Sequence, residues 1–505
     1  MPILMSVHIS QMIAGIALDR QGSQPLYRQL YAEIRKSILA GQMLPGMQLP
    51  PSRAFCQVLN ISRQTVLNAY DQLLAEGYLR GSVGQGTFVN EDLPAIAERG
   101  KATISDIPAA QLLDRISRRG RQHIDPRGST RFHQGSVRAF RVSMPDLDLF
   151  PFDIWARLEA RHCRHPKGQL GYGDPAGHLA LRELLAVYLK AARGVNCAPE
   201  QILITSGSQQ ALYLLSTMLL DPGEKAVVEY PCYRGTTAAL HASQADICAV
   251  PVDDEGMDVE YAAMHYPDAK IAFVTPSHQM PLGMTMSLQR RMALLEWAQA
   301  NAVWIVEDDY DSEYRFGSSP LASLQSLDTH QSVIYVGTLS KVLFPGLRLG
   351  YLVLPEKLLE PMIQAKAVID KHTSIMPQMT LADFIAEGHF GRHIKRTRKV
   401  YADRQACLID CLEKELGDEL ICGAQDGGLD LAVYFKQVDD EEQIIEAGQK
   451  IGLELRGLGH YADVPGKLDR PAESPGGLLL GFASLDCAEI ERSVSKLATL
   501  FKAAH

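Results

Sequence analysis

A short loop in the second half of the chain carries the residue types that hold a phosphate beside a reactive amine. The run Val336–Tyr351 follows the apolar stretch Ser332–Tyr335 and places hydroxyl groups, Lys341 and Arg348 between glycines and prolines. Arginine makes forked, charge-assisted hydrogen bonds to phosphate, and a lysine amine becomes a nucleophile when its pKa is lowered. A lone loop lysine is more often a solvated charge, so this interpretation requires partners elsewhere in the chain.

Three upstream segments supply such partners. Ser206–Leu212 is a small-residue turn entering a predicted helix, where backbone N–H groups and the positive helix end face an anion. Tyr233 offers a ring that can stack on a flat heterocycle. Asp308 and Tyr310 follow a strand pattern ending at Glu307, and they suit a pyridine nitrogen and a phenolic oxygen. Together these residues indicate a site for pyridoxal phosphate.

The elements that must position these residues alternate between strand-like and helical patterns. Such alternation predicts an α/β fold with a mostly parallel sheet and ligands at the carboxyl ends of its strands. The predicted strands are Gln201–Thr205, Ala226–Glu229, Ile271–Thr275, Val303–Glu307 and Ser332–Tyr335.

Composition limits the class of protein. The chain has 505 residues, 46% hydrophobic and 22% charged, which predicts two or three globular domains. Its nine cysteines show no CxxC pair and no metal-ligand spacing, which favours reduced thiols and no metal site. No apolar run is long enough to span a membrane and no secretion signal is recognisable, so a cytoplasmic protein is expected.

The net charge of −9 conceals a basic N-terminal module. Between Gln24 and Asn90 there are six Arg or Lys residues and three acids. Helical spacing of Leu26, Leu30, Ile34 and Ile38 predicts a first helix, broken at Gly41 and Pro45–Gly46.

Two further helices and a hairpin complete the predicted module. Pro50–Ser52 starts a short helix, with Ser52 as its cap, and Ser62 caps a third helix. The glycine-rich run Gly81–Gly86 predicts a hairpin wing. The order of these elements predicts a winged helix-turn-helix, although a small helical domain that contacts only protein is the alternative.

The stretches PLYRQLYAEIRKSILAG, LPGMQLPPSRAF, ISRQTVLNAYDQLLAEGYL and GQGTFV resemble the DNA-binding domain of GntR-type bacterial regulators. The resemblance implies contacts with double-stranded promoter or operator DNA. The implied DNA-contacting residues are Arg53, Arg63, Gln64, Thr65, Gly84 and Gly86.

Residues 91–141 read as a basic linker between residues 1–90 and 142–505. It serves either as a solvated tether or as a steering segment with non-specific phosphate contacts. The arginines concerned are Arg115, Arg118, Arg119, Arg121, Arg127, Arg131, Arg138 and Arg141.

The motifs SGSQQAL, EDDYDSEYRF and TLSKVLFPGLRLGY resemble fold-type I, pyridoxal-phosphate-dependent aminotransferases across residues 142–505. By that resemblance Lys341 forms the internal aldimine, Asp308 pairs with the ring nitrogen, Tyr310 with the ring hydroxyl, and Tyr233 stacks on the ring. Tyr172 is the implied contact to a neighbouring subunit's cofactor. The implied phosphate ligands are Ser208, Gln209, Thr338, Ser340 and Arg348.

Two positions depart from the aminotransferase pattern. Met280 stands where an asparagine usually contacts the ring hydroxyl, and Leu479 stands where an arginine usually clamps the substrate carboxylate. Arg456 is a candidate replacement for that clamp, and a solvated surface arginine is the alternative.

A GntR-type head joined to an aminotransferase-like body resembles the MocR family of bacterial transcription regulators. The resemblance implies a regulator that binds pyridoxal phosphate and senses that cofactor, an amine or an amino acid through Lys341. A working aminotransferase carrying a DNA-binding module is the alternative, and a DNA-binding scaffold without cofactor is a third hypothesis. A homodimer is implied, with a domain-swapped arrangement among its possible forms.

Overall fold

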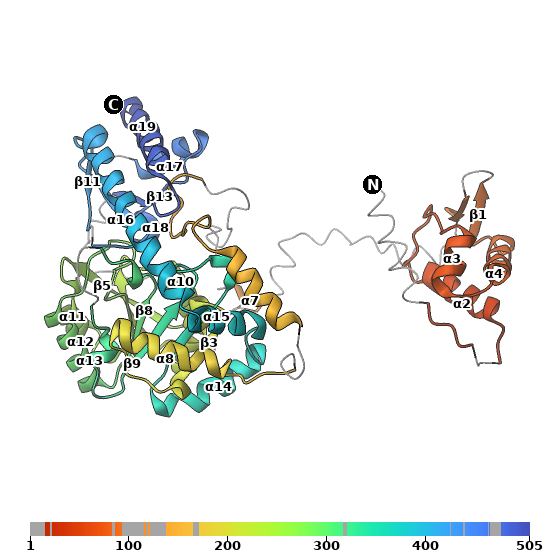
Figure 1. Cartoon of the computed structure of the whole chain (residues 1–505), viewed down its shortest axis with the longest axis horizontal. Helices are drawn as coiled ribbons and strands as arrows, with labels where there is room; N and C mark the ends of the chain where they lie inside the picture. Colours follow the sequence, from red (N-terminus) through yellow and green to blue (C-terminus); the bar gives the residue numbers. More distant parts are fainter. Residues whose placement is uncertain are drawn as a thin grey trace. The chain divides into compact units, whose positions relative to one another are not determined.

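The computed structural model describes residues 16–20, 23–82, 86–92, 116–117, 120–121, 138–164, 171–316, 321–424, 426–437, 440–462, 464 and 476–504. Its contacts divide the chain into two compact units, Met1–Ile116 and Ser117–His505 (Figure 1). The predicted boundaries at residues 90 and 141 stay predictions, because most of the proposed linker lies outside the described residues. No helix among the described residues is long and apolar enough to cross a membrane.

The first unit is a winged helix-turn-helix, as predicted. Its apolar residues form one core that includes Leu30, Ile34, Phe55, Val66 and Leu73, because each helix turns one apolar stripe inward. The hairpin strands pair antiparallel in the register Leu79↔Val89. The elements are α2 (Leu26–Leu39), α3 (Ser52–Leu59), α4 (Arg63–Ala75), β1 (Leu79–Ser82) and β2 (Gly86–Val89).

Helix starts in this unit follow the predicted caps at one position and not at the other. The Ser62 hydroxyl accepts the Thr65 backbone N–H at 3.1 Å, so Ser62 is the N-cap of α4. Ser52 is not a cap, because α3 begins at Ser52 and Pro51 holds the N-cap position. The Ser52 hydroxyl instead accepts from Arg63 Nε at 3.2 Å.

The second unit is built on an eight-stranded sheet of order β3-β10-β9-β8-β7-β4-β5-β6. Its strands are β3 (Ile202–Thr205), β4 (Lys225–Tyr230), β5 (Asp246–Asp253), β6 (Gly256–Met257), β7 (Ile271–Val274), β8 (Trp304–Asp309), β9 (Val333–Thr338) and β10 (Gly350–Val353). Every predicted strand falls on one of these. The sheet is mostly parallel, with β10 antiparallel to both of its neighbours and β6 antiparallel to β5.

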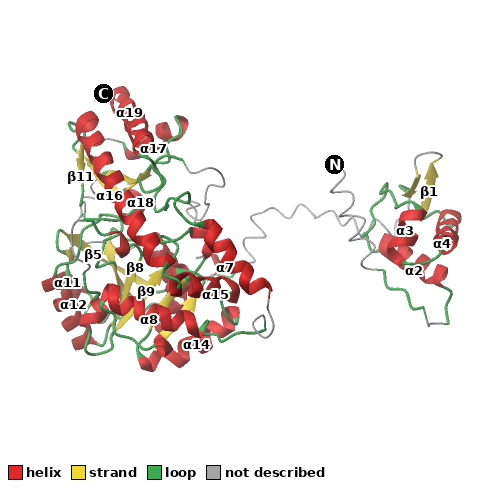
Figure 2. Cartoon of the chain, in the orientation of Figure 1, coloured by secondary structure: helices red, strands yellow, loops and turns green. Residues whose placement is uncertain are grey.

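Helices cover this sheet on both faces, which is why its central strands read as continuous apolar runs (Figure 2). The helices are α7 (Phe152–Arg164), α8 (Leu179–Arg193), α9 (Ser208–Leu219), α10 (Arg234–Ser243), α11 (Val259–His265), α12 (Leu288–Asn301), α13 (Leu324–Leu327), α14 (Glu356–Asp370) and α15 (Ile375–Ala386). The described residues also form the single-turn 3-10 helices η2 (Pro199–Gln201), η3 (Ser312–Tyr314) and η4 (Pro345–Leu347).

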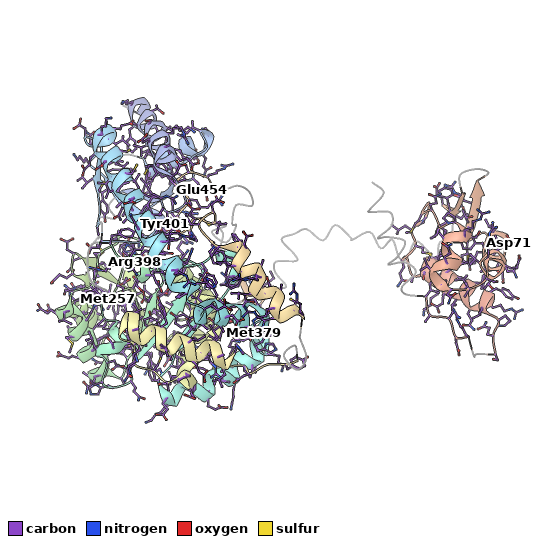
Figure 3. The ribbon with its side chains drawn as sticks, viewed as in Figure 1. Asp71, Met257, Met379, Arg398, Tyr401 and Glu454 are labelled. Carbon is purple, nitrogen blue, oxygen red and sulfur yellow. The ribbon has the colours of Figure 1, made fainter. Side chains whose placement is uncertain are left out.

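A smaller antiparallel sheet of order β11-β12-β14-β13 forms the C-terminal part of this unit. The 28-residue helix α16 (His389–Leu416) joins the two parts, with Phe390 in the core of the large sheet and Tyr401 in that of the small sheet (Figure 3). The remaining elements are β11 (Leu420–Cys422), β12 (Asp430–Phe435), α17 (Glu441–Lys450), β13 (Arg456–Gly457), α18 (Gly459–Ala462), β14 (Gly477–Gly481) and α19 (Cys487–Ala504).

The segment Arg138–Phe150 fastens the start of the second unit to the small sheet. Phe140 bridges Gly481, and Arg141 pairs with Glu454 at 2.8 Å. Phe140 and Ser143 both have left-handed φ angles, of 67° and 59°. Non-glycine residues rarely adopt this conformation, so the surrounding contacts must hold the segment in place.

Candidate functional site

Lys341 lies just beyond β9 and is held by a contact far away in the sequence. Its Nζ donates to the Ser143 backbone oxygen at 3.0 Å. Ser143 in turn donates to the Asp430 carboxylate, from its backbone N–H at 2.6 Å and from its hydroxyl at 3.1 Å. Burial lowers the pKa of Lys341, although the charges of Asp430, Asp311 and Asp308 oppose this effect. A larger fraction of the amine is therefore unprotonated and nucleophilic.

Asp308 sits near the end of β8 with one carboxylate oxygen unpaired. Its side chain is 8% exposed, and its Oδ1 has no hydrogen-bond partner among the described residues. Burial, followed by the charge of Asp309, raises the pKa of Asp308 to about 7, while Lys341 acts in the opposite direction. A buried acid left unpaired by its own chain suits a cationic ring nitrogen.

Tyr310 hydrogen-bonds a histidine that sequence reasoning missed. Its hydroxyl lies 2.8 Å from His278 Nδ1, and the same nitrogen lies 3.0 Å from Asp311 Oδ2. Burial lowers the pKa of His278, but the Asp311 carboxylate outweighs burial and the net pKa is raised. Because an ionised carboxylate only accepts, Nδ1 must carry the proton. The Tyr310 O–H proton is thus left to donate elsewhere, such as to a phenolic oxygen.

A cup of small and polar residues forms where β3 and β9 end on either side of the start of β10. Gly350 of β10 pairs with Thr205 on one side and Thr338 on the other. The Ser340 hydroxyl is buried and has no partner among the described residues. Helix α9 begins at Ser208, so its free N–H groups open on the cup.

Arg348 reaches the same cup from the far side of the loop. Its Nη2 donates to the Ser206 backbone oxygen at 2.9 Å. A Cβ at Gly207 would lie 3.0 Å from that nitrogen, and Gly207 has a φ of +96°. Gly207 is therefore required both by the turn and by the close approach of the guanidinium. Gln209 uses its side-chain amide on the Gly235 oxygen at 2.9 Å.

Tyr233 lies between the two ends of the site. It is the N-cap residue of α10, and a Cβ on Gly235 would lie 2.2 Å from its ring. Burial raises the pKa of Tyr233, Asp308 raises it further, and Arg348 lowers it. The ring is thus within electrostatic reach of the acid and of the cup.

These observations fit pyridoxal phosphate. The unpaired Asp308 oxygen suits the ring nitrogen, the free Tyr310 proton suits the ring hydroxyl, and the cup with Arg348 suits the phosphate. The fit depends on strands far apart in sequence that end at one edge of the sheet.

Tyr172 is not joined to this set by any contact among the described residues. It is 93% exposed, with its ring centroid 6.3 Å from that of His372. Met280 precedes a cis proline and is buried with Leu479 in a cluster that also contacts Tyr233 and Tyr310. Two large apolar side chains therefore occupy the positions where the aminotransferase pattern has asparagine and arginine.

Arg456 lies directly opposite Leu479, because β13 pairs with β14 in that register. The strand pairing thus places the candidate clamp beside the position of the missing arginine.

Among the predicted DNA contacts, Arg53, Arg63, Gln64 and Gly86 are exposed and Thr65 is half-buried. Arg63 Nε is positioned by Ser52, and Gln64 Nε2 donates to Asn68 at 2.8 Å. The predicted residues lying outside the described part of the chain are Gly84 of the wing and the linker arginines Arg115, Arg118, Arg119, Arg127 and Arg131.

Four residues missed by sequence reasoning are Ser143, His278, Asp311 and Asp430. Asp311 and His278 could have been found from the sequence, because Asp311 lies within the EDDYDSEYRF motif and His278 lies two residues before Met280. Ser143 and Asp430 carry no local signal, because their contact joins residues 287 positions apart.

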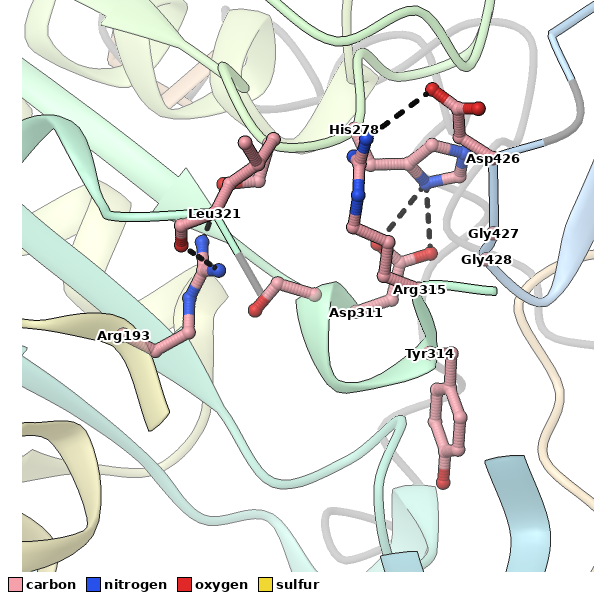
Figure 4. Close-up of a pocket in the computed structure, with 11 residues that line it drawn as sticks. Arg193, His278, Asp311, Tyr314, Arg315, Leu321, Asp426, Gly427 and Gly428 are labelled. Atoms are coloured by element: carbon pink, nitrogen blue, oxygen red, sulfur yellow. Dashed lines mark hydrogen bonds and ion pairs between the residues drawn. The ribbon is translucent and has the colours of Figure 1, made fainter. Parts of the chain in front are cut away.

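A small pocket is lined by His278 and Asp311 together with Arg193 and Arg315 (Figure 4). Arg193 projects into it and donates to the Leu321 oxygen at 2.7 Å, and Arg315 faces Asp426 at 3.5 Å. Behind this pocket Arg193 forms a buried ion pair with Asp309 at 2.8 Å. That ion pair stabilises the end of β8, because Asp309 lies between Asp308 and Tyr310 in the chain.

Known proteins resemble both units. Residues 26–89 match the family described as bacterial regulatory proteins, gntR family, and residues 145–451 match aminotransferase class I and II. The chain is 37% identical over 489 residues to the probable rhizopine catabolism regulatory protein MocR of Rhizobium meliloti, covering 97% of this chain and 96% of that protein.

Two further similarities concern a regulator and an enzyme. The pyridoxine biosynthesis transcriptional regulator PdxR of Corynebacterium glutamicum is 29% identical, covering 95% of this chain and 98% of its own. The structure of LysN, an α-aminoadipate aminotransferase of Thermus thermophilus complexed with N-(5'-phosphopyridoxyl)-L-leucine, matches with a TM-score of 0.66 at 29% identity. That match covers 74% of this chain and 95% of LysN.

Proposed function

The chain belongs to the MocR family of regulators, in which a GntR-type head and an aminotransferase-like body share one chain, and from that premise we propose that the body senses an effector at Lys341. The protein is a pyridoxal-phosphate-dependent transcriptional regulator that binds DNA. The effector class is an amine, an amino acid or the cofactor itself.

The cofactor would be held by the residues of the site. Asp308, Tyr310 and Tyr233 would hold the ring, and the phosphate ligands would be Ser208, Gln209, Thr338, Ser340 and Arg348. When bound, pyridoxal phosphate supplies an aldehyde that condenses reversibly with primary amines. Lys341 is the buried amine with a lowered pKa that this chain offers to it.

The observation that carries the sensing function is the hydrogen bond from Lys341 Nζ to Ser143. Ser143 lies on the segment through which the linker enters the body, and Asp430 anchors it from the other side. A change in what Lys341 binds would therefore break or keep the hydrogen bond to Ser143, and so act first on the part of the chain that leads to the DNA-binding head. Such a contact supplies the differential interaction that a ligand-driven switch requires.

The head would read DNA through exposed residues at the start of α4. Arg63 and Gln64 are the candidates for base and phosphate contacts, with Arg53, Thr65 and the wing glycines beside them. A cytoplasmic homodimer, with Tyr172 reaching the partner's cofactor site, completes the proposal. The 93% exposure of Tyr172 is consistent with such a role.

A catalytic aminotransferase is the second candidate, because Lys341, Asp308 and Tyr310 keep the arrangement needed for it. Met280 and Leu479 argue against amino-acid turnover, since they remove a polar ring contact and the usual carboxylate clamp. We therefore propose a sensor with at most a single half-reaction.

The decisive variant is Lys341→Ala in the full chain loaded with pyridoxal phosphate. It should lose the visible absorbance of the lysine-bound cofactor and more than tenfold of the amine-induced change in DNA affinity. Affinity is measured on a duplex selected by the protein from a random pool. Lys395→Ala, an exposed lysine on α16, is the matched control and should keep both properties.

Two results would contradict the proposal. Repeated release of keto acid by the unmodified protein would make it an enzyme. An unchanged amine response in Lys341→Ala would place sensing at another site.

A further inference from the structure

We propose that Arg456 binds the carboxylate of the effector, so that the body selects amino acids over simple amines. The inference rests on the proposed function, because it requires an amine to be recognised beside Lys341. It goes further by naming a chemical class, an amine that also carries a carboxylate. It also assigns the contact to a strand other than the one that carries the usual arginine.

The small sheet has two faces with different neighbours. Leu431, Leu478 and Leu480 lie in the core beneath α16 and α19. Ala432 and Leu479, one residue along on each strand, lie instead in the cluster with Met280. Side chains alternate between the faces of a sheet, so the first face is structural and the second faces the cofactor site.

Arg456 belongs to the second face. Leu455, the residue before it, is buried in the structural core with Leu431 and Leu478. Arg456 is also directly opposite Leu479, and opposed residues of an antiparallel pair project to the same side. Arg456, Leu479 and Ala432 thus form one row across three strands, on the side that holds Met280, Tyr233 and Tyr310.

The guanidinium of Arg456 is held near the site but is not used by the chain. Arg456 is half-buried, and its side chain makes no hydrogen bond or ion pair within the described residues. The charge of Arg456 nevertheless acts on Tyr461, a buried residue of the Met280 cluster. Burial raises the pKa of Tyr461 and Asp430 raises it further, whereas Arg456 lowers it.

Other arginines around the site are engaged. Arg348 donates to Ser206, Arg234 to His460 at 3.4 Å, and Arg315 to Thr285 at 2.9 Å. A half-buried guanidinium without a partner is costly unless a ligand supplies one, and its planar fork matches a carboxylate. Among the arginines named here, Arg456 is therefore the one whose side chain has no partner in the described part of the chain, on the face that surrounds the cofactor site.

The test compares amino acids with the amines that lack their carboxylate. The pairs are glycine with methylamine, L-alanine and β-alanine with ethylamine, and 4-aminobutanoate with propylamine. Each is titrated into the protein loaded with pyridoxal phosphate, and both the visible absorbance and the DNA affinity are recorded. At least one amino acid should act at a concentration tenfold or more below that of its partner amine.

Arg456→Gln should abolish that advantage while leaving the response to simple amines unchanged. Arg456→Lys should restore part of it, because the charge remains and the fork is lost. Arg456→Gln combined with Leu479→Arg should also restore it, because the arginine returns to the adjacent position in the row. Arg492→Gln, an exposed arginine on α19, is the matched control and should behave as the unmodified protein.

The outcomes separate this inference from the proposed function. No response to any amine would overturn sensing at Lys341 and Arg456 with it. Equal responses to amino acids and amines, or an advantage that survives Arg456→Gln, would overturn the role of Arg456 alone. Cofactor absorbance and far-ultraviolet circular dichroism of each variant report whether it has folded and kept its cofactor.

Discussion

At the scale of single residues, the site is an acid and a base arranged around polar atoms that the chain leaves unpaired. His278 donates a hydrogen bond from Nδ1–H to the Asp311 carboxylate. The Tyr310 hydroxyl can therefore donate its own proton to another acceptor. Asp308 keeps an unpaired oxygen in a buried position where its pKa is about 7. A buried polar atom without a partner lowers stability, and proteins tolerate such a cost where function requires it.

Asp308 provides a test with a defined sign. Its pKa in the folded chain lies above the ordinary value of 3.8, so the native state binds this proton more tightly than the unfolded state. In cofactor-free protein, the stability that comes from the protonated Asp308 carboxyl is fully present below pH 4. It is lost as the pH rises to about 7.

Asp308→Asn should therefore raise the free energy of unfolding at pH 8 by a few kcal/mol and leave it unchanged at pH 4. Urea unfolding at both pH values measures this difference. Asp403→Asn, an exposed acid on α16, serves as the control. The same Asp308→Asn variant should bind pyridoxal phosphate at least tenfold more weakly, and equal stability gains at the two pH values would contradict the assignment.

At the scale of elements, the cup depends on a turn rather than on a helix or a strand alone. β3 ends at Thr205, α9 begins at Ser208, and the two residues between them bring Gly207 against Arg348. Antiparallel β10 carries Gly350 back beside this turn, where a Cβ would lie 2.8 Å from the Gly207 carbonyl carbon. Small residues at both positions let three strand ends meet.

Gly207→Ala should weaken cofactor binding tenfold or more, because its Cβ would displace the Arg348 guanidinium. It should also destabilise the fold by about 1–3 kcal/mol, because a φ of 96° with a ψ of 168° is a backbone conformation almost confined to glycine. Gly223→Ala is the matched control, with a φ of +85° and no atom within 4 Å of the added Cβ.

The control should also lose stability, through its positive φ, but it should lose no cofactor affinity. Spectrophotometric titration with pyridoxal phosphate and thermal unfolding distinguish the two effects. Equal cofactor affinities for the two variants would exclude the Arg348 contact as the cause.

At the scale of the whole molecule, the proposed route from the site to the head begins at the segment 138–143. It is held at one point by Asp430, which accepts from Ser143, and at another by Glu454, which pairs with Arg141 at 2.8 Å. Both contacts join the N-terminal end of the body to its C-terminal sheet. This segment is therefore held by the same contacts that position Lys341.

Loosening either anchor should uncouple the effector from DNA. Asp430→Asn and Glu454→Gln should each reduce the amine-induced change in DNA affinity about tenfold, while cofactor absorbance and DNA affinity without amine stay unchanged. The pair is informative because the charge of Asp430 raises the pKa of Lys341, whereas Glu454 holds the segment through its ion pair with Arg141.

Fluorescence anisotropy on the selected duplex, with and without amine, measures the coupling. A loss confined to Asp430→Asn would mean that charge at Lys341, and not the segment, carries the signal. Full coupling in both variants would exclude this route.

Much of the protein follows from its sequence alone, because the informative features are local. The cap at Ser62, the apolar stripes of α2 and α4, the small-residue turn at Ser206–Gly207 and the acid near the end of β8 are each read from neighbouring residues. Local hydrogen bonds and side-chain periodicity determine these elements. They were enough to predict the winged helix-turn-helix and the mostly parallel sheet.

The tertiary structure alone decided which distant groups meet. The Ser143–Asp430 contact, the tautomer of His278 and the register of Arg456 against Leu479 depend on chain segments brought together by packing. A strand register is specified by which face is buried, and that burial exists only once the two sheets, α16 and α19 are assembled. The sequence therefore indicates the chemistry at Lys341, whereas the assembled fold determines what surrounds it and which segment it contacts.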